Sequence, residues 1–124
     1  MCIEDTKTYI EDNIFNKIIK KEIPAKIIFE NTHALSFYDI NPLAKIHALV
    51  IPKGNYIDAL DFTNASAEEI KSLQMAIFET AKILKVNESG FRLISNCGIN
   101  GGQEVPHFHY HILGGEKIGK MVNK

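Results

Sequence analysis

The sequence predicts one α+β domain built on a five-stranded antiparallel sheet, with one long and one short helix. Five short runs rich in β-branched and aromatic residues are separated by turn-forming residues, a pattern typical of antiparallel strands. Two other segments repeat their apolar residues at helical spacing. The length of 124 residues suits a single domain with one core.

Composition and charge argue against several classes of protein. The net charge is −1, which gives no overall basic surface for nucleic acid or an anionic membrane. No apolar run approaches the roughly 20 residues that span a bilayer, and the first residues do not resemble a secretion signal. Two cysteines, Cys2 and Cys97, are too few for a disulfide framework, and Cys97 is expected to be a small filler in its loop. We therefore expect a cytoplasmic protein.

The N-terminal part predicts a loose end followed by a helix. Residues 1–12 are polar and lack a steady period, so a flexible N-terminus is expected. Apolar residues at helical spacing predict a short helix over Asn13–Lys21, capped by Asp12 or Asn13 and stopped by Pro24.

Three strands are expected next. The runs Ala25–Phe29 and Ala34–Tyr38 flank a turn-like E-N-T and predict a hairpin. The run His47–Pro52 is continuously apolar after its first residue and predicts a buried third strand. A loop with a possible helical turn over residues 54–63 leads onward.

The long helix is the clearest element in the sequence. Ser66-Ala67-Glu68-Glu69 has the pattern of a capping box, and the helix is expected to continue to about Lys85. One stripe should face the sheet: Ile70, Leu73, Ile77, Ala81 and Leu84. Met75 and Phe78 lie off that stripe, and a second apolar flank on a surface helix indicates a partner.

The last two predicted strands are Phe91–Ser95 and Val105–Gly115. The second carries three histidines at alternate positions, His107, His109 and His111. Because residues i, i+2 and i+4 of a strand share one face, three imidazoles are expected in a row about 7 Å apart. The intervening aromatic and aliphatic residues would face the core.

Two kinds of chemistry can use such a row. Alternate histidines on a strand can share a metal ion, and histidine can also act as a nucleophile and proton carrier near neutral pH. The loop Asn96–Glu104, rich in glycine and asparagine, precedes the histidines directly. Closely spaced backbone amides in such a loop can bind an anion, so a phosphate cradle beside a catalytic row is expected.

The run G-G-Q-E-V-P-H-F-H-Y-H-I-L-G-G resembles the signature of the histidine triad (HIT) family. I-F-N-K-I-I-K-K-E-I-P-A-K-I-I-F-E, F-Y-D-I-N-P and H-A-L-V-I-P-K are similar to segments of its Hint branch, in the same order. The resemblance covers residues 13–115 and implies one HIT domain followed by a C-terminal tail at 116–124. It also implies a HIT-like fold whose sheet pairs into a ten-stranded sheet in a homodimer, through the long helix.

The resemblance implies hydrolysis at the α-phosphorus of a purine nucleoside 5′-phosphoramidate, and relatives of this type also act on aminoacyl-adenylates. His109 matches the nucleophile, and its attack would give a nucleotidyl-histidine intermediate. His111 would contact the phosphate and assist proton movement. His107 would hold neighbouring backbone and set ring orientation, while His47 would orient the triad.

A purine nucleotide site is implied by the same resemblance. Asp39 would accept hydrogen bonds from the ribose hydroxyls, as an ionised carboxylate can. Glu104 is expected to turn its side chain away from the phosphate, because like charges repel. The expected nucleotide-binding residues are Ile14, Phe15, Ile23, Phe37, Asp39, Ile40, Asn96, Gly102, Gln103, Glu104, Val105, His109 and His111.

No cofactor and no structural zinc are expected. Relatives that carry zinc have cysteines where this chain has Asn13 and Asn16, and a histidine where it has Asn55, and neutral amides are poor zinc ligands. Three rival functions remain at this point. They are cleavage of dinucleoside polyphosphates or nucleotidyl transfer, a nucleotide-binding module with vestigial catalysis, and a metal-dependent hydrolase that uses the triad as ligands.

Overall fold

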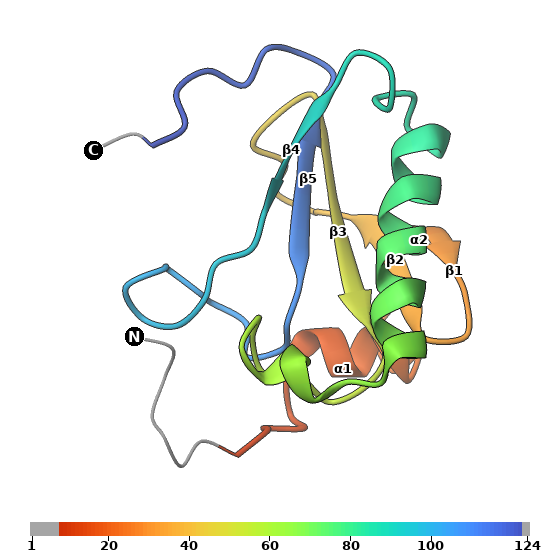
Figure 1. Cartoon of the computed structure of the whole chain (residues 1–124), viewed down its shortest axis with the longest axis vertical. Helices are drawn as coiled ribbons and strands as arrows, with labels where there is room; N and C mark the ends of the chain where they lie inside the picture. Colours follow the sequence, from red (N-terminus) through yellow and green to blue (C-terminus); the bar gives the residue numbers. More distant parts are fainter. Residues whose placement is uncertain (1–7, 123–124) are drawn as a thin grey trace.

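The computed structural model describes residues 8–122 and contains the expected antiparallel five-stranded sheet (Figure 1). The strand order is β1-β2-β3-β5-β4, so β1 and β4 form the two edges. Every neighbouring pair is antiparallel. The strands are β1 (Ile27–Glu30), β2 (Ala34–Tyr38), β3 (Ile46–Pro52), β4 (Phe91–Ile94) and β5 (Tyr110–Gly114).

Two α-helices and one 3₁₀ turn complete the fold. Helix α1 (Ile14–Ile19) is capped by the Asn13 side chain, which accepts a hydrogen bond from the Asn16 backbone N–H. It ends earlier than predicted, and Lys21 adopts a left-handed conformation with φ 63°. The 3₁₀ turn η1 (Asp61–Asn64) leads to helix α2 (Ala67–Ile83). The predicted capping box of α2 is confirmed, since Ser66 and Glu69 each bond the other's backbone N–H.

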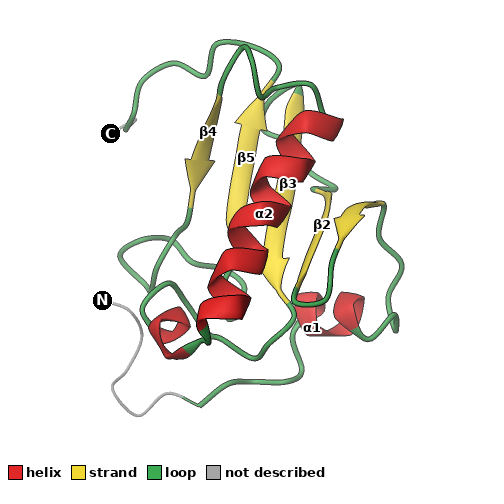
Figure 2. Ribbon diagram, turned by 45° about the vertical axis from the view of Figure 1, so that its right-hand side comes forward, coloured by secondary structure: helices red, strands yellow, loops and turns green. Residues whose placement is uncertain are grey.

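The sheet is covered on both faces, which is why β3 is almost entirely buried. Helix α2 lies over one face, where it contacts β1, β2 and β3 (Figure 2). On β3, Ala48 and Val50 belong to the core beneath α2. The alternate residues Leu49 and Ile51 pack with Phe15 of α1 on the other face. The molecule therefore has two cores, one on each side of the sheet.

The sequence-based stripe of α2 is partly wrong. Leu73, Ile77 and Ala81 are buried as expected, but Ile70 is 46% exposed. Thr80, which lies outside the expected stripe, is fully buried and donates a hydrogen bond of 2.7 Å to Ser36 of β2. A buried hydroxyl is stable among aliphatic side chains when it finds such a partner.

The strand that carries the histidines is shorter than predicted. Ladder pairing begins at Tyr110, so His107 and His109 precede β5. The backbone of this segment is bonded by other partners: Phe108 N–H donates to the Tyr56 carbonyl, and Ser95 Oγ donates to the His109 carbonyl. The segment therefore lies outside the ladder, and residues 105–107 form a bend closed by a hydrogen bond from His107 N–H to the Val105 carbonyl.

Two further sequence expectations concern single features. Cys97 is disulfide-bonded in the structure, a bond that the sequence analysis did not predict. Residues 1–7 and 123–124, including Cys2, lie outside the described residues. Among the described helices, none has both the length and the apolar character needed to cross a membrane.

Candidate active site

A cavity of about 500 Å³ lies against the face of the sheet that α1 covers. Its volume is in the ordinary range for small-molecule sites, roughly 300–1,000 Å³. Its walls come from α1, the end of β2 and the loop after it, the middle of β3, the glycine-rich loop and the histidine segment. The lining residues are Ile14, Phe15, Ile18, Ile23, Pro24, Ala25, Phe37, Tyr38, Asp39, Ile40, Leu43, Leu49, Asn96, Gly102, Glu104, Val105, His109 and His111.

All but one of the residues expected to bind nucleotide line this cavity. The exception is Gln103, whose side chain forms hydrogen bonds with backbone groups of the glycine-rich loop and of its neighbours. Its amide oxygen accepts a hydrogen bond from Gly98 N–H, and its amide nitrogen donates to the carbonyls of Ile57 and Val105. Six lining residues were not expected, and most are apolar residues without a distinctive sequence signal: Ile18, Pro24, Ala25, Tyr38, Leu43 and Leu49.

The hydrogen bonds of His109 fix which of its ring nitrogens carries the proton. Nδ1 lies 2.7 Å from the carbonyl oxygen of His107, and a carbonyl only accepts, so Nδ1 carries the proton. Nε2 is then the nitrogen with a lone pair. The ring packs edge-on against Phe15 at 4.9 Å. Burial lowers the pKa of His109, partly opposed by its bond to the His107 carbonyl and by Asp39 and Glu104, so the neutral form is favoured.

His107 is a buried anchor and does not line the cavity. Its Nε2 donates a hydrogen bond of 2.8 Å to the Pro52 carbonyl, and its Nδ1 accepts one from the Tyr9 hydroxyl. Asn13 in turn donates to Tyr9 at 2.9 Å. Burial lowers the pKa of His107 to about 4, so the ring stays neutral and both of its nitrogens are satisfied.

Tyr9 is a site residue that the sequence did not reveal. It lies in the polar segment assigned to a flexible N-terminus, where no periodicity marks it. Its ring meets that of His107 edge-on at 5.6 Å. The described part of that segment thus carries a direct contact to the first histidine of the triad.

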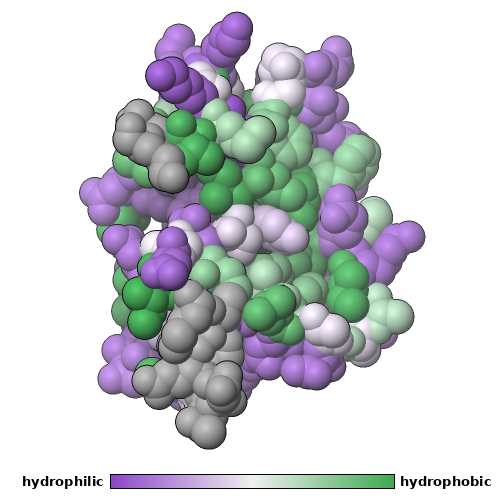
Figure 3. All heavy atoms as spheres, turned by 60° about the vertical axis from the view of Figure 1, so that its left-hand side comes forward, coloured by the Kyte–Doolittle hydropathy of each residue, from purple (hydrophilic) through white to green (hydrophobic). Residues whose placement is uncertain are grey.

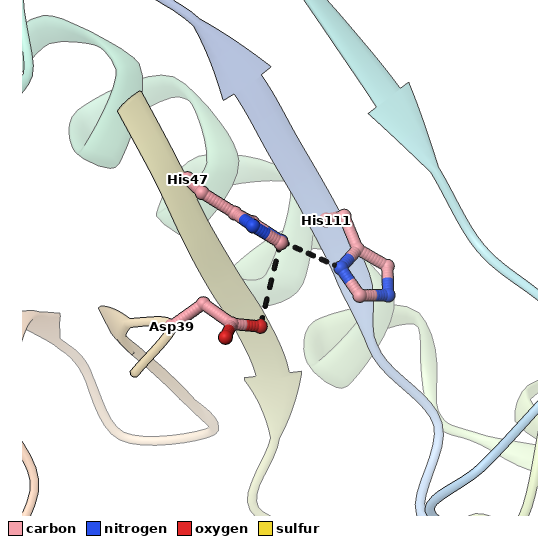
Figure 4. Close-up of side chains that lie close together, drawn as sticks. All are labelled: Asp39, His47 and His111. Atoms are coloured by element: carbon pink, nitrogen blue, oxygen red, sulfur yellow. Dashed lines mark hydrogen bonds and ion pairs between the residues drawn. The ribbon is translucent and has the colours of Figure 1, made fainter. Parts of the chain in front are cut away.

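A second hydrogen-bond chain sets the protonation of His111. The Leu43 N–H donates to His47 Nδ1 at 3.0 Å, which leaves the proton of His47 on Nε2. That Nε2 lies 2.9 Å from His111 Nδ1 and 3.5 Å from Asp39 Oδ2 (Figure 4). His111 Nδ1 must therefore accept, and its Nε2 carries the proton. Burial lowers the pKa of His111 to about 4, helped by His109 and His47.

Asp39, His47 and His111 are also the one cluster in residues 8–122 that could hold a metal, with ligand atoms within 4.8 Å of one another. The hydrogen bonds argue against that use. His47 would have to give up the proton on Nε2 while its Nδ1 still accepts from Leu43, which a neutral imidazole cannot do. The three side chains fit a hydrogen-bond chain that fixes the tautomers of His47 and His111 better than they fit a metal site.

The glycine-rich loop presents backbone to the cavity. Gly102 lines it and has φ 78°, a left-handed conformation that L side chains rarely adopt. At Gly101 a Cβ atom would lie 2.5 Å from the Cys97 carbonyl oxygen, so a side chain would force the loop apart. Glu104 also lines the cavity and is exposed, and its carboxylate acts electrostatically on His109. The expectation that the Glu104 side chain turns away from the phosphate stays a prediction.

Comparison with known proteins agrees with this geometry. The family model for the HIT domain matches residues 20–118. A 13.2 kDa HIT-like protein of Azospirillum brasilense is 47% identical over 119 residues, covering 95% of this chain and 98% of the relative. The purine nucleoside phosphoramidase of Escherichia coli is 41% identical over 115 residues, covering 90% and 94%.

Solved structures show the same fold. A HIT family hydrolase from Clostridium thermocellum superposes with a TM-score of 0.85 at 38% identity, over 91% of this chain and 99% of that one. A histidine triad protein from Clostridium difficile gives a TM-score of 0.83 at 39% identity, over 93% and 100%. The chain therefore belongs to the HIT domain family, whose solved members include a hydrolase.

Proposed function

We propose that this protein is a purine nucleotide hydrolase that cleaves the P–N bond of adenosine 5′-phosphoramidates, with the P–O bond of aminoacyl-adenylates as a second target. The observation that carries the proposal is the protonation state of His109. Its Nδ1 proton is held by a backbone carbonyl, which leaves the Nε2 lone pair for attack at a cavity-lining position. The similarity to a purine nucleoside phosphoramidase supports the choice of substrate.

The cavity walls fit the parts of a nucleotide. Ile14, Phe15 and Phe37 offer an apolar slot for a purine. Asp39 lies at the polar end, where its carboxylate can accept hydrogen bonds from ribose hydroxyls. The backbone around Gly102 and the Nε2–H of His111 can donate to phosphoryl oxygens.

The reaction proceeds in two displacements at phosphorus. The His109 Nε2 lone pair forms a bond to phosphorus, the P–N bond to the amine breaks, and the departing amine nitrogen takes a proton from solvent. The nucleotidyl-histidine carries a positive charge that the His107 carbonyl stabilises through Nδ1–H. Water then attacks phosphorus and releases its proton. The bond to His109 breaks, and nucleoside monophosphate and neutral histidine are restored.

His109→Ala tests the proposal. Turnover of an adenosine phosphoramidate should fall by several orders of magnitude, as when a covalent nucleophile is removed from other hydrolases. AMP binding, measured by calorimetry, should persist because the proposed base and ribose contacts lie elsewhere. Rapid-quench mass spectrometry of wild type should show an added nucleotidyl mass on the peptide containing His109. Full activity in His109→Ala would end the proposal.

We also propose that the protein is a homodimer. Helix α2 contacts β1, β2 and β3, at one side of the sheet. Strand β4 forms the edge at the other side of the sheet, and its Leu93 is exposed. Figure 3 shows hydrophobic side chains gathered across the side of the molecule where β4 lies. A second copy that meets β4 and the neighbouring flank of α2 would extend the sheet to ten strands. Twofold pairing is the commonest assembly of soluble proteins.

A further inference from the structure

The charge of the cavity does not match an anionic substrate. Among the described residues that line it, two are carboxylates, Asp39 and Glu104, and none is lysine or arginine. The lining histidines His109 and His111 have lowered pKa values and are neutral near pH 7. Two lysines line neighbouring hollows instead: Lys26 shares one with Asp39, and Lys21 lines another beside Ile23.

Of the two carboxylates, only Asp39 has a proposed partner in the nucleotide, and that partner, the ribose, is uncharged. Its proposed partners are ribose hydroxyls, and it also accepts the Asn41 N–H locally and faces His47. Glu104 has no ion-pair partner within residues 8–122. Glu104 and His109, the proposed nucleophile, line the same cavity, and the carboxylate acts electrostatically on the ring of His109.

A carboxylate at this position repels the phosphoryl oxygens unless the substrate brings a positive charge of its own. The purine, the ribose and the phosphate supply none, so the charge must come from the leaving amine. Glu104 lines the cavity and is also exposed to solvent, so a leaving group that runs from phosphorus toward solvent can pass beside it.

We propose that Glu104 is a specificity residue that selects phosphoramidates whose leaving amine carries a second, positively charged group. The inference rests on the proposed function and names the class of leaving group, such as a diamine attached through one nitrogen. Glu104 takes no part in bond making. It stabilises the bound substrate and the transition state when the leaving group is cationic, and it destabilises both when the leaving group is anionic.

The test uses three adenosine 5′-phosphoramidates with alkyl leaving amines of equal length, ending in an ammonium, a methyl or a carboxylate group. The wild-type kcat/KM should follow that order. One charge pair at contact distance in water corresponds to about fivefold, and partial shielding from water increases the ratio. The ammonium preference should shrink as salt is raised, because exposed charges are screened.

Glu104→Gln should bring the three substrates to within about twofold of one another while all are still cleaved. Glu104→Lys should reverse the order. Glu88→Gln removes an equal charge from the exposed turn between α2 and β4 and serves as the matched control, in which the wild-type order should remain.

The outcomes separate the two proposals. If wild type cleaves none of the three compounds, the proposed function fails. If wild type cleaves all three without a preference for the ammonium compound, or if Glu104→Gln retains that preference, the role of Glu104 is overturned while the hydrolase assignment stands.

Discussion

At the residue scale, the site depends on which ring nitrogen of each histidine carries the proton, and hydrogen bonds determine this for His109 and His111. The histidine spacing predicted which side chains gather, and His109 and His111 do line one cavity. It did not predict their protonation, because that depends on two backbone groups. One is the His107 carbonyl, which holds the proton of His109. The other is Leu43 N–H, which acts on His111 through His47, a residue 64 positions away from His111 in the sequence. Backbone groups leave no mark on a sequence pattern.

The buried histidines make stability depend on pH. The pKa of His107 is lowered to about 4, below its ordinary value of 6.5, because burial disfavours the charged ring. Between these values the unfolded chain binds more protons than the folded one, so the free energy of unfolding should fall as the pH drops from 6.5 toward 4. The contribution of His107 is roughly 3 kcal/mol, and His111 adds to it in the same direction.

Urea unfolding between pH 4.5 and 7.5 measures this dependence. His107→Gln should lower stability at pH 7, since it disturbs the bonds to Tyr9 and Pro52, but it should flatten the acid limb of the curve. An unchanged slope in the variant would show that the acid sensitivity arises elsewhere.

At the scale of the elements, local signals predicted α2 well and the histidine strand less well. The start of α2 follows from Ser66 and Glu69, which bond each other without help from the rest of the chain. Ladder pairing at His107 and His109 depends instead on what lies alongside. There, Tyr56 and Ser95 take backbone groups that a longer strand would have used. Aromatic and β-branched content alone could not show this competition.

The capping box gives a prediction for α2. Ser66→Ala removes the oxygen that accepts from Glu69 N–H and should lower the free energy of unfolding by about 1 kcal/mol. The melting temperature should drop by a few degrees, in line with a shift of about 4 °C or more per kcal/mol for a small domain. Ser66→Thr keeps the hydroxyl and should stay near wild type in a calorimetric scan. Equal losses in the two variants would mean that the cap is not the cause.

At the scale of the whole molecule, the two faces of the sheet are divided between stability and chemistry. The face beneath α2 is packed with aliphatic and aromatic residues, and the opposite face carries α1 and the cavity. The sequence predicted the sheet and its helices, and it placed Met75 and Phe78 on one outer flank of α2. The structure separates them, because Met75 lines a hollow beside β1 with Phe29 and His33.

This separation sharpens the test of the proposed dimer. Phe78 is 49% exposed, and helical geometry turns it away from β1, toward the side where β4 lies. Phe78→Glu should therefore shift the protein to monomers in sedimentation at micromolar concentration. Met75→Glu places the same charge on the β1 flank and should leave the dimer intact. A wild-type protein that sediments as a monomer would refute the assembly.

The bond from His109 Nδ1 to the carbonyl of His107 has a consequence for mutational robustness. In serine hydrolases the corresponding acceptor is an aspartate side chain, which a single codon change can delete. Here the acceptor is part of the main chain, and every amino acid at position 107 supplies it. Substitution there can tilt or loosen the ring of His109. The carbonyl group that holds the Nδ1 proton of the proposed nucleophile remains in every such variant.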